Sequence, residues 1–431
     1  MVWGYHTKCG GKVLDVQQLV QRALYVCLIC AIACASSADG STYDTYSQTS
    51  RLILQFTSPQ ATLTAADILI TEPYNQTTTI DLLSYDLSFI AVTARSPSSK
   101  QAKDPYFLLP NISQVIEDDI RWPESADALS PDVHANSLHE TGEANDPLFH
   151  QQWGLRTMKI PETWSLADIK FDTRSPITVA IIDTGVDFTH PDLQGAYHSA
   201  SYDWVLGTPQ VTDKNGHGTH LAGIIAASTD NNIGMSGIAP VRILSETVYE
   251  EGIGIYTSRS AMAICHAAQA GAQIILLGYG GKNYSDIEAK AISYARNQGS
   301  LIIASAGNDQ SNASHYPSDM QSVISVGSIS ESESISVFSN YGIFLDFVGP
   351  GQNVYGAAPE TRNVRKSGTS QAAAGVSGVA ALIWSFDASL TAQDVQALLT
   401  DSAHDLGKAG KDIYYGWGYP DSLSAAQLLM G

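Results

Sequence analysis

Runs of apolar, mostly β-branched residues recur along the chain from Asn145 onward, and segments rich in Ala and Gly separate them. Apolar runs without polar alternation are typical of parallel strands buried on both faces of a sheet. The segments between them have the length and composition of helices. The runs are residues 177–182, 273–277, 301–304 and 323–326. Residues 145–431 are therefore predicted to form an α/β domain in which a mostly parallel, buried sheet lies between helices.

The region before this domain has a different pattern, in which short β-like runs alternate with polar segments. The β-like runs are residues 52–56, 87–92 and 112–116, and a helix is expected near residues 64–70. Residues 39–122 are thus predicted to form a small α+β unit. Residues 123–144 have almost no apolar pattern and contain two prolines, so they are predicted to form an exposed linker.

The first residues carry a targeting pattern. A short apolar run, residues 23–35, follows Lys12 and Arg22 and leads into the small residues 36–38. This order is that of a secretory signal peptide, which we assign to residues 1–38. The run is shorter than the roughly 20 residues that span a bilayer, so no stable membrane anchor is expected. The long segment before the run leaves a signal anchor as the alternative.

Glycosylation signals and charge agree with a secreted protein. N-x-S/T sequons occur at Asn75, Asn111, Asn283 and Asn312. Acidic residues outnumber basic ones 43 to 23, which gives a formal charge of −20. A surface of this sign repels phosphate groups, so nucleic acids and anionic membranes are not expected as partners.

Cysteine positions exclude a disulfide framework in the predicted α/β domain. Four of the five cysteines precede residue 39, and only Cys265 follows. The C-x-x-C at Cys27 and Cys30 lies inside the apolar run, with no redox fold around it. Cys265 lies in a stretch with helical character, residues 258–272, and is expected to be a small core residue.

Four polar residues stand where predicted strands end or helices begin, which is where sites gather in open α/β sheets. Asp183 and Asn308 follow apolar runs, whereas His217 and Ser370 precede helical segments rich in small residues. Taken singly, these residues are explained as a turn aspartate, a strand-end amide, half of a metal pair with His220, and a helix cap. Zinc lacks a third ligand at suitable spacing. Together they offer a nucleophile, a base, a carboxylate that orients the base, and an oxyanion donor.

The sequences around these residues resemble those of a known family. Residues 181–193, 215–223 and 368–370 resemble the three signature blocks of the subtilase family of serine proteases. The resemblance extends over residues 145–429 and implies a three-layer, subtilisin-like fold. It also implies a secreted serine endopeptidase with Asp183, His217 and Ser370 as the catalytic triad and Asn308 in the oxyanion hole.

The resemblance further implies a self-processing zymogen that acts on extended polypeptides, is monomeric and needs no organic cofactor. Residues 39–122 would be a propeptide that inhibits and assists folding, with cleavage between Asp132 and Glu143. Substrate would pair with two strand edges, and His315 would limit the depth of the pocket for an apolar or medium-sized residue before the cut. The residues implied in substrate binding are Gly252, Gly254, Leu277, Gly278, Tyr279 and Gly280. Those implied in a structural Ca²⁺ site are Asp146, Asp192, Asn231, Ile233 and Met235.

Two departures from the family pattern keep an alternative open. After the serine the family commonly has Met-Ala-x-Pro-His, whereas this chain has Gln371 and then Ala374 and Gly375 in place of the Pro and His. The family's Asn-Met-Ser-Leu-Gly-Gly becomes Leu-Leu-Gly-Tyr-Gly-Gly at residues 276–281, where Gly278 and Tyr279 would reshape the substrate pocket. The alternative is a catalytically impaired pseudoprotease that acts as a binding protein. A lipase or esterase is disfavoured because the G-x-S-x-G pattern is absent.

Overall fold

The computed structural model describes residues 49–58, 61–62, 78–84, 88–95, 112–123, 126–130, 144–167 and 175–431. The chain divides into two compact units, residues 1–118 and 119–431. The predicted signal peptide and the helix expected near residues 64–70 lie outside the described residues. The boundary falls four residues before the predicted end of the propeptide at residue 122.

The first unit contains a four-stranded antiparallel sheet with the strand order β2-β3-β1-β4. The strands are β1 Thr49–Phe56, β2 Thr78–Ser84, β3 Phe89–Arg95 and β4 Ile112–Glu117. The three β-like runs of the sequence are therefore strands. Strand β2 was not predicted, because its apolar residues Ile80, Leu82 and Leu83 do not alternate regularly with polar ones. Within β1 and β3, Leu52, Leu54 and Ile90 are fully buried, so this sheet has an apolar interior.

A seven-stranded parallel sheet forms the centre of the second unit, with the order β15-β14-β13-β11-β7-β9-β8. Its strands are β7 Thr178–Asp183, β8 Tyr202–Asp203, β9 Arg242–Thr247, β11 Ile274–Leu277, β13 Leu301–Ser305, β14 Val323–Ile329 and β15 Phe347–Pro350. Every residue of β7, β11, β13 and β14 is buried. The predicted parallel sheet is confirmed, because burial on both faces requires the apolar runs seen in the sequence.

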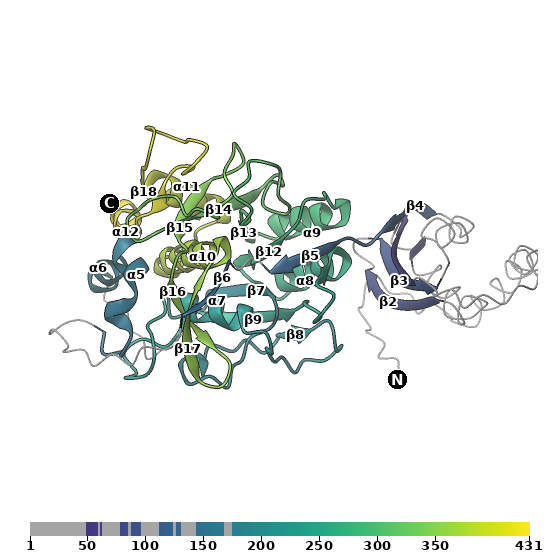
Figure 1. Ribbon diagram of the computed structural model, residues 1–431, viewed down its shortest axis with the longest axis horizontal. Helices are drawn as coiled ribbons and strands as arrows, with labels where there is room; N and C mark the ends of the chain where they lie inside the picture. Colours follow the sequence, from purple (N-terminus) through teal and green to yellow (C-terminus); the bar gives the residue numbers. More distant parts are fainter. Residues whose placement is uncertain are drawn as a thin grey trace, which may run out of the picture. The chain divides into compact units, whose positions relative to one another are not determined.

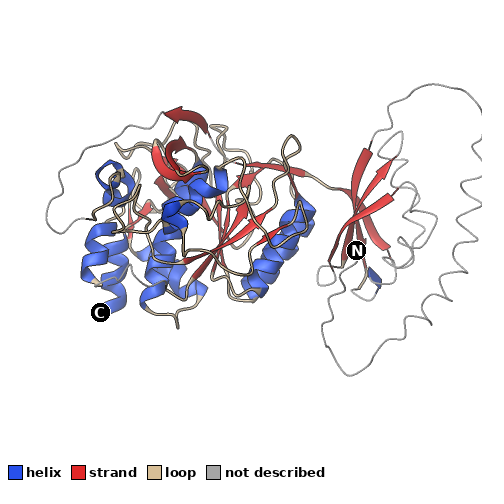
Figure 2. Ribbon diagram, turned by 90° about the horizontal axis from the view of Figure 1, so that it is seen from below, coloured by secondary structure: helices blue, strands red, loops and turns tan. Residues whose placement is uncertain are grey.

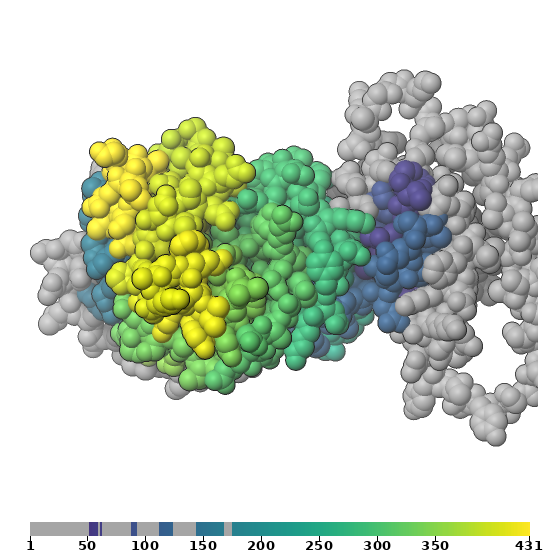
Figure 3. Space-filling view, turned by 90° about the horizontal axis from the view of Figure 1, so that it is seen from above, coloured from purple at the N-terminus to yellow at the C-terminus, as the bar shows by residue number. Residues whose placement is uncertain are grey.

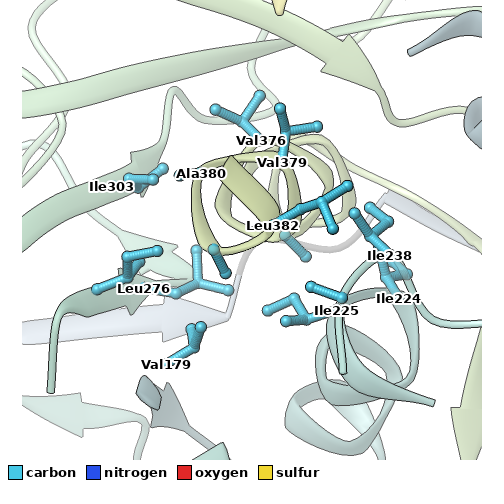
Figure 4. Close-up of a cluster of buried hydrophobic side chains, with 14 of the residues drawn as sticks. Val179, Ile224, Ile225, Ile238, Leu276, Ile303, Val376, Val379, Ala380 and Leu382 are labelled. Carbon is cyan, nitrogen blue, oxygen red and sulfur yellow. The ribbon is translucent and has the colours of Figure 1, made fainter. Parts of the chain in front are cut away.

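Helices cover both faces of this sheet, which gives the predicted three-layer architecture (Figure 2). The main helices are α7 His217–Ala226, α8 Thr257–Gln269, α9 Asp286–Asn297 and α10 Thr369–Phe386. Figure 4 shows α10 at the centre of the core, with Val376 and Leu382 among side chains from the sheet and from α7. Small residues on α7 and α10 allow these helices to pack closely.

Shorter elements complete the second unit (Figure 1). They are η3 Phe149–Gln151, α5 Trp153–Thr157, α6 Ile160–Leu166, η4 Pro191–Leu193, β16 Val354–Ala358, β17 Arg362–Ser367, α11 Ala392–Asp401, β18 Ala403–His404, β19 Tyr419–Pro420 and α12 Ser422–Met430. Residues of α12, drawn in yellow, form part of the surface in Figure 3. The buried Ser422 Oγ joins α12 to α6 through Thr163 Oγ1 at 2.6 Å.

Two strands of the second unit come from the start of its sequence. Strand β5, Ile120–Pro123, lies antiparallel between β10, Ile255–Tyr256, and β12, Tyr279–Gly280. Strand β6, Ala126–Ser130, pairs antiparallel with β17. Residues 126–130 thus form a strand where an exposed linker was expected. Their pairing is through the main chain, which needs no apolar alternation in the sequence.

Candidate active site

Asp183 and His217 form a buried pair at the carboxyl end of the sheet. Asp183 is the last residue of β7 and His217 the first of α7. His217 Nδ1 lies 2.7 Å from Asp183 Oδ1, which also accepts a hydrogen bond from the Thr184 backbone N–H. Both side chains are at most 1% exposed. His217 Nε2 is buried and has no hydrogen-bond partner among the described residues. The carboxylate therefore favours the tautomer in which Nδ1 is protonated and Nε2 can accept a proton.

Glycines allow α7 to begin this close to β7. Gly216 precedes the helix with a φ of 83°, in the left-handed region. A Cβ on Gly218 would lie 2.2 Å from the carbonyl oxygen of Gly185, in the turn after β7. Any larger residue at position 218 would therefore push the imidazole away from Asp183.

Ser370 lies at the start of α10 and meets the Asp–His pair at Gly278. Its side chain is buried, and Oγ donates a hydrogen bond to the Gly278 carbonyl at 2.9 Å. A Cβ on Gly278 would lie 2.6 Å from Asp183 Oδ2 and 3.3 Å from His217 Cε1. The structure thus brings the three predicted triad residues together around Gly278. It also gives a reason for glycine here, because a side chain would collide with the pair.

Asn308 presents an amide donor beside the start of α10. Its Oδ1 accepts from the backbone N–H of Thr369 at 3.0 Å and from Thr369 Oγ1 at 3.1 Å. These donors fix the amide orientation and leave Nδ2 as a donor, which is buried without a partner in the described part of the chain. The backbone N–H groups of the first turn of α10 are also without intrahelical partners. Both kinds of donor suit a developing oxyanion.

The residues after Ser370 are packed differently from the family pattern. Gln371 is fully buried, and neither atom of its amide has a partner among the described residues. The Cα of Gly375 faces Met158, whose Cε would lie 3.3 Å from an added Cβ. Met158 therefore occupies the space beside position 375, where the family commonly has an imidazole.

Strand β5 pairs with two strand edges, as predicted for substrate, but only some of the pairing residues are the predicted ones. Tyr279 and Gly280 of β12 are opposite Pro123 and Trp122. On the other side the pairing residues are Ile255 and Tyr256, with the Thr257 N–H donating to the Asp119 carbonyl at 2.9 Å.

Four of the residues predicted to bind substrate, Gly252, Gly254, Leu277 and Gly278, are not paired with β5. Gly254 lies against Ile120, whereas an added Cβ on Gly252 would meet nothing within 4 Å. Leu277 belongs to β11 in the central sheet, so its main chain pairs with β7 and β13.

His315 lies beside the β12 edge. It is 4% exposed, and an added Cβ on Gly280 or Gly307 would contact its ring. Gly307 precedes Asn308, so the imidazole lies between the β12 edge and the loop that carries the amide. This location is compatible with the expected role at the floor of the pocket.

The residues expected to bind calcium converge on one loop. Asp146 and Asp192 are fully buried, and Asn231 donates to both, through its backbone N–H to Asp146 at 3.0 Å and through Nδ2 to Asp192 at 2.9 Å. Burial, with the charge of Asp146, raises the pKa of Asp192 to about 6. Two buried carboxylates beside an amide form a donor set that suits Ca²⁺. Within the described ranges, no three His, Cys, Asp or Glu side chains cluster as metal ligands.

None of the helices in the described residues is both long enough and apolar enough to cross a bilayer.

A parallel α/β sheet with an Asp–His pair, a serine and an amide at its carboxyl end is characteristic of a serine hydrolase. Residues 174–418 match the model of the subtilase family, Peptidase_S8. The chain is 36% identical over 286 residues to thermitase from Thermoactinomyces vulgaris, covering 66% of this chain and 99% of that protein. It is 32% identical over 338 residues to the halolysin-like extracellular serine protease Nep from Natrialba magadii, covering 77% of this chain and 59% of Nep.

A solved structure shares the fold. Fervidolysin from Fervidobacterium pennivorans, described as a keratinolytic enzyme related to subtilisin, superposes with a TM-score of 0.73 at 23% identity. The match covers 90% of this chain and 62% of fervidolysin. The chain belongs to the subtilase family and is a serine endopeptidase, an enzyme that hydrolyses polypeptides.

Proposed function

We propose that this subtilase is a secreted zymogen that cuts itself, with Asp183, His217 and Ser370 as its triad. Turning from Gly278, Ser370 Oγ would attack the peptide carbonyl carbon while its proton passes to His217 Nε2. The carbonyl electrons move to oxygen, which Asn308 Nδ2 and the Ser370 N–H stabilise. The C–N bond then breaks as His217 returns the proton to the departing amine. Water hydrolyses the acyl-enzyme by the same proton transfers, so no organic cofactor takes part.

The observation that carries this proposal is the pairing of residues 120–123 with β12, which begins one residue after Gly278, and of residues 126–130 with β17, which ends three residues before Ser370. Strand β5 ends at Pro123 opposite Tyr279, and the residue before Tyr279 is Gly278, which accepts from Ser370 Oγ. Strand β6 resumes at Ala126, opposite Ser367, three residues before Ser370. A substrate is expected to bind in this way, with the residues before the cut paired with β12 and the residues after it paired with β17.

This register moves the expected processing site. Gly278 is one residue beyond the Tyr279–Pro123 pair, so we expect the cut one residue beyond Pro123, at the Glu124–Ser125 bond. The sequence favoured the interval between Asp132 and Glu143, which lies outside the described residues. A cut after Glu124 would also place an acidic residue where an apolar one was expected, in the pocket that contains His315.

Intact mass of the full-length chain and of its Ser370→Ala variant tests the proposal. Wild type is expected to yield a fragment that begins at Ser125, while the variant remains whole. A well-folded wild type that also remains whole would instead support the pseudoprotease. Gln371 follows Ser370, and its buried amide has no hydrogen-bond partner in the described part of the chain. This departure next to the nucleophile favours the pseudoprotease as the second candidate.

Calcium binding, secretion and glycosylation belong to the same proposal. Asp146, Asp192 and Asn231 would hold a structural Ca²⁺ ion that offsets the two buried carboxylate charges, with the Ile233 and Met235 carbonyls completing the set. Chelator is expected to lower the melting temperature of the Ser370→Ala protein, and the Asp192→Asn variant to be insensitive to it. If chelator leaves the melting temperature of the Ser370→Ala protein unchanged, with Asp146, Asp192 and Asn231 intact, the Ca²⁺ site does not exist. Asn283 and Asn312 are exposed and suit glycosylation.

Residues 39–122 would act as the inhibitor and folding aid, and the enzyme would be monomeric. Adding the released fragment to mature enzyme is expected to inhibit peptide hydrolysis. Undiminished hydrolysis at saturating fragment would refute the inhibitory role.

A further inference from the structure

The most completely buried large side chain on β5 is a cation. Arg121 is fully buried, whereas its neighbour Trp122 is 50% exposed. The Arg121 guanidinium lies against α9, where Nε and Nη2 donate to Glu288 Oε2 at 3.1 and 2.7 Å. Glu288 is also fully buried. Its carboxylate is the partner of a side chain that the chain itself inserts into the substrate cleft.

Hydrogen bonds hold the Glu288 carboxylate in a fixed orientation. Ser260 Oγ, on α8, donates to Glu288 Oε1 at 2.7 Å and lies 2.6 Å from the Tyr279 hydroxyl. Because burial raises the pKa of Tyr279 well above its usual range, the phenol keeps its proton and can donate to Ser260. One carboxylate oxygen is therefore held by the enzyme, and the other faces Arg121. Tyr279, which departs from the family pattern, takes part in this arrangement.

The surroundings of Glu288 also fit a guanidinium group in size and charge. A Cβ on Gly281 would lie 3.0 Å from Arg121 Nη1, so glycine leaves room for the side chain. Arg121 Nη1 donates in addition to Asp119 Oδ2 at 3.1 Å, within the bound segment. Glu288 lies in the first turn of α9, where the helix dipole favours a negative charge.

Once the segment departs, this carboxylate loses its partner. A buried charge without a counter-ion is strongly unfavourable, and any side chain that lacks a cation would leave it uncompensated. The planar guanidinium of arginine can donate two hydrogen bonds to the single oxygen Oε2, whereas lysine presents a point charge. Glu288 therefore selects by its charge and by the geometry of the hydrogen bonds that it accepts.

We propose that Glu288 is a specificity-determining residue that selects polypeptides with arginine three residues before the residue whose carbonyl is cut. The inference rests on the proposed function, because the cut after Glu124 sets the count. The substrates are accordingly polypeptides with an extended segment in which this arginine precedes the cut, as in residues 121–124 of the chain itself.

The experiment uses mature enzyme from the full chain and a quenched fluorescent peptide with the sequence of residues 117–130. Companion peptides carry Gln, Lys or Ala in place of Arg121. Wild type is expected to have a kcat/KM about 100-fold higher for the arginine peptide than for the glutamine peptide, with lysine between them. Mass spectrometry of the products locates the cut.

Enzyme variants assign the selectivity to Glu288. Glu288→Gln is expected to reduce the preference for arginine to a few-fold, because no buried charge is then left uncompensated by the glutamine peptide. Asp286→Asn removes an exposed charge from the same turn of α9 and is expected to keep the full preference. Equal rates of wild type on all four peptides would overturn the inference and leave the protease function standing. So would a preference that survives in Glu288→Gln. If Glu288→Gln does not mature, the wild-type peptide series decides alone. Failure of wild type to cut any peptide or unfolded casein would instead refute the proposed function and the inference with it.

Discussion

Two buried ion pairs in the second unit differ in what happens to their partners during the reaction. Asp183 and His217 belong to β7 and α7, so they stay together whether or not a substrate is bound. Arg121 and Glu288 are 167 residues apart, and Arg121 lies on the strand that occupies the cleft. On the proposed function the first pair is a permanent part of the enzyme, whereas the second would form again with each substrate. A permanent Asp183–His217 pair suits proton transfer, and an exchangeable partner for Glu288 suits the selection of substrates.

The sharpest test of the permanent pair is Asp183→Asn. The amide keeps the volume but favours the wrong tautomer of His217 and removes the charge that stabilises its cation. We expect kcat on the arginine peptide to fall by about 10⁴, with a much smaller change in KM. A loss confined to KM would mean that Asp183 binds substrate instead of orienting the base.

Asn308→Leu separates the oxyanion donor from the pair. Because the amide would act only when charge develops on the carbonyl oxygen, kcat is expected to fall by about 10² to 10³. The peptide series should retain its preference for arginine, since Glu288 is untouched. Equal effects on kcat and KM would contradict a role confined to the transition state.

The exchangeable pair is broken most directly in the uncut Ser370→Ala protein. Arg121→Ala leaves Glu288 buried without its partner, and we expect the free energy of unfolding of the second unit to fall by about 3 kcal/mol. Combining Arg121→Ala with Glu288→Gln should restore part of this loss, because no unpaired charge then remains. Denaturant unfolding of the four proteins measures the coupling. Additive effects would show that the two side chains do not stabilise each other.

The same contrast shows how far the sequence could lead. The parallel sheet was predictable because apolar runs locate its strands. The positions of Asp183, His217, Asn308 and Ser370 at strand ends and helix starts were predictable for the same reason. Strands β5 and β6 were not, because they pair through the main chain with distant edges and their sequence has no alternating pattern. Their partners are identified only by the fold.

Glu288 illustrates a signal that points elsewhere. Ser285 and Glu288 have the spacing of a capping box, so the sequence assigns this carboxylate to the start of a helix. In the structure Ser285 Oγ accepts from the Glu288 N–H at 3.5 Å, but the carboxylate turns to Ser260 and Arg121. The counter-ion 167 residues away has no local mark in the sequence.

A third pair, His266 with Glu246, extends the comparison to a pair that water can reach. His266 Nδ1 lies 2.6 Å from Glu246 Oε1, with the imidazole 32% exposed and the carboxylate buried. Burial lowers the pKa of His266, but the hydrogen bond and charge of Glu246 more than offset this, and the pKa is raised. A raised pKa means that the contribution to stability is complete below about pH 6.5, the unfolded value. It is lost as pH rises through the folded value.

His266→Gln should therefore destabilise the uncut Ser370→Ala protein by about 1 kcal/mol or less near pH 5.5, where the imidazole is charged. The difference should shrink near pH 8, where wild type also carries a neutral ring and keeps only a neutral hydrogen bond. Urea unfolding of both proteins at the two pH values measures it. A difference that grows with pH would mean that the neutral imidazole makes the stabilising contact, and water at this surface would then have screened the charge entirely.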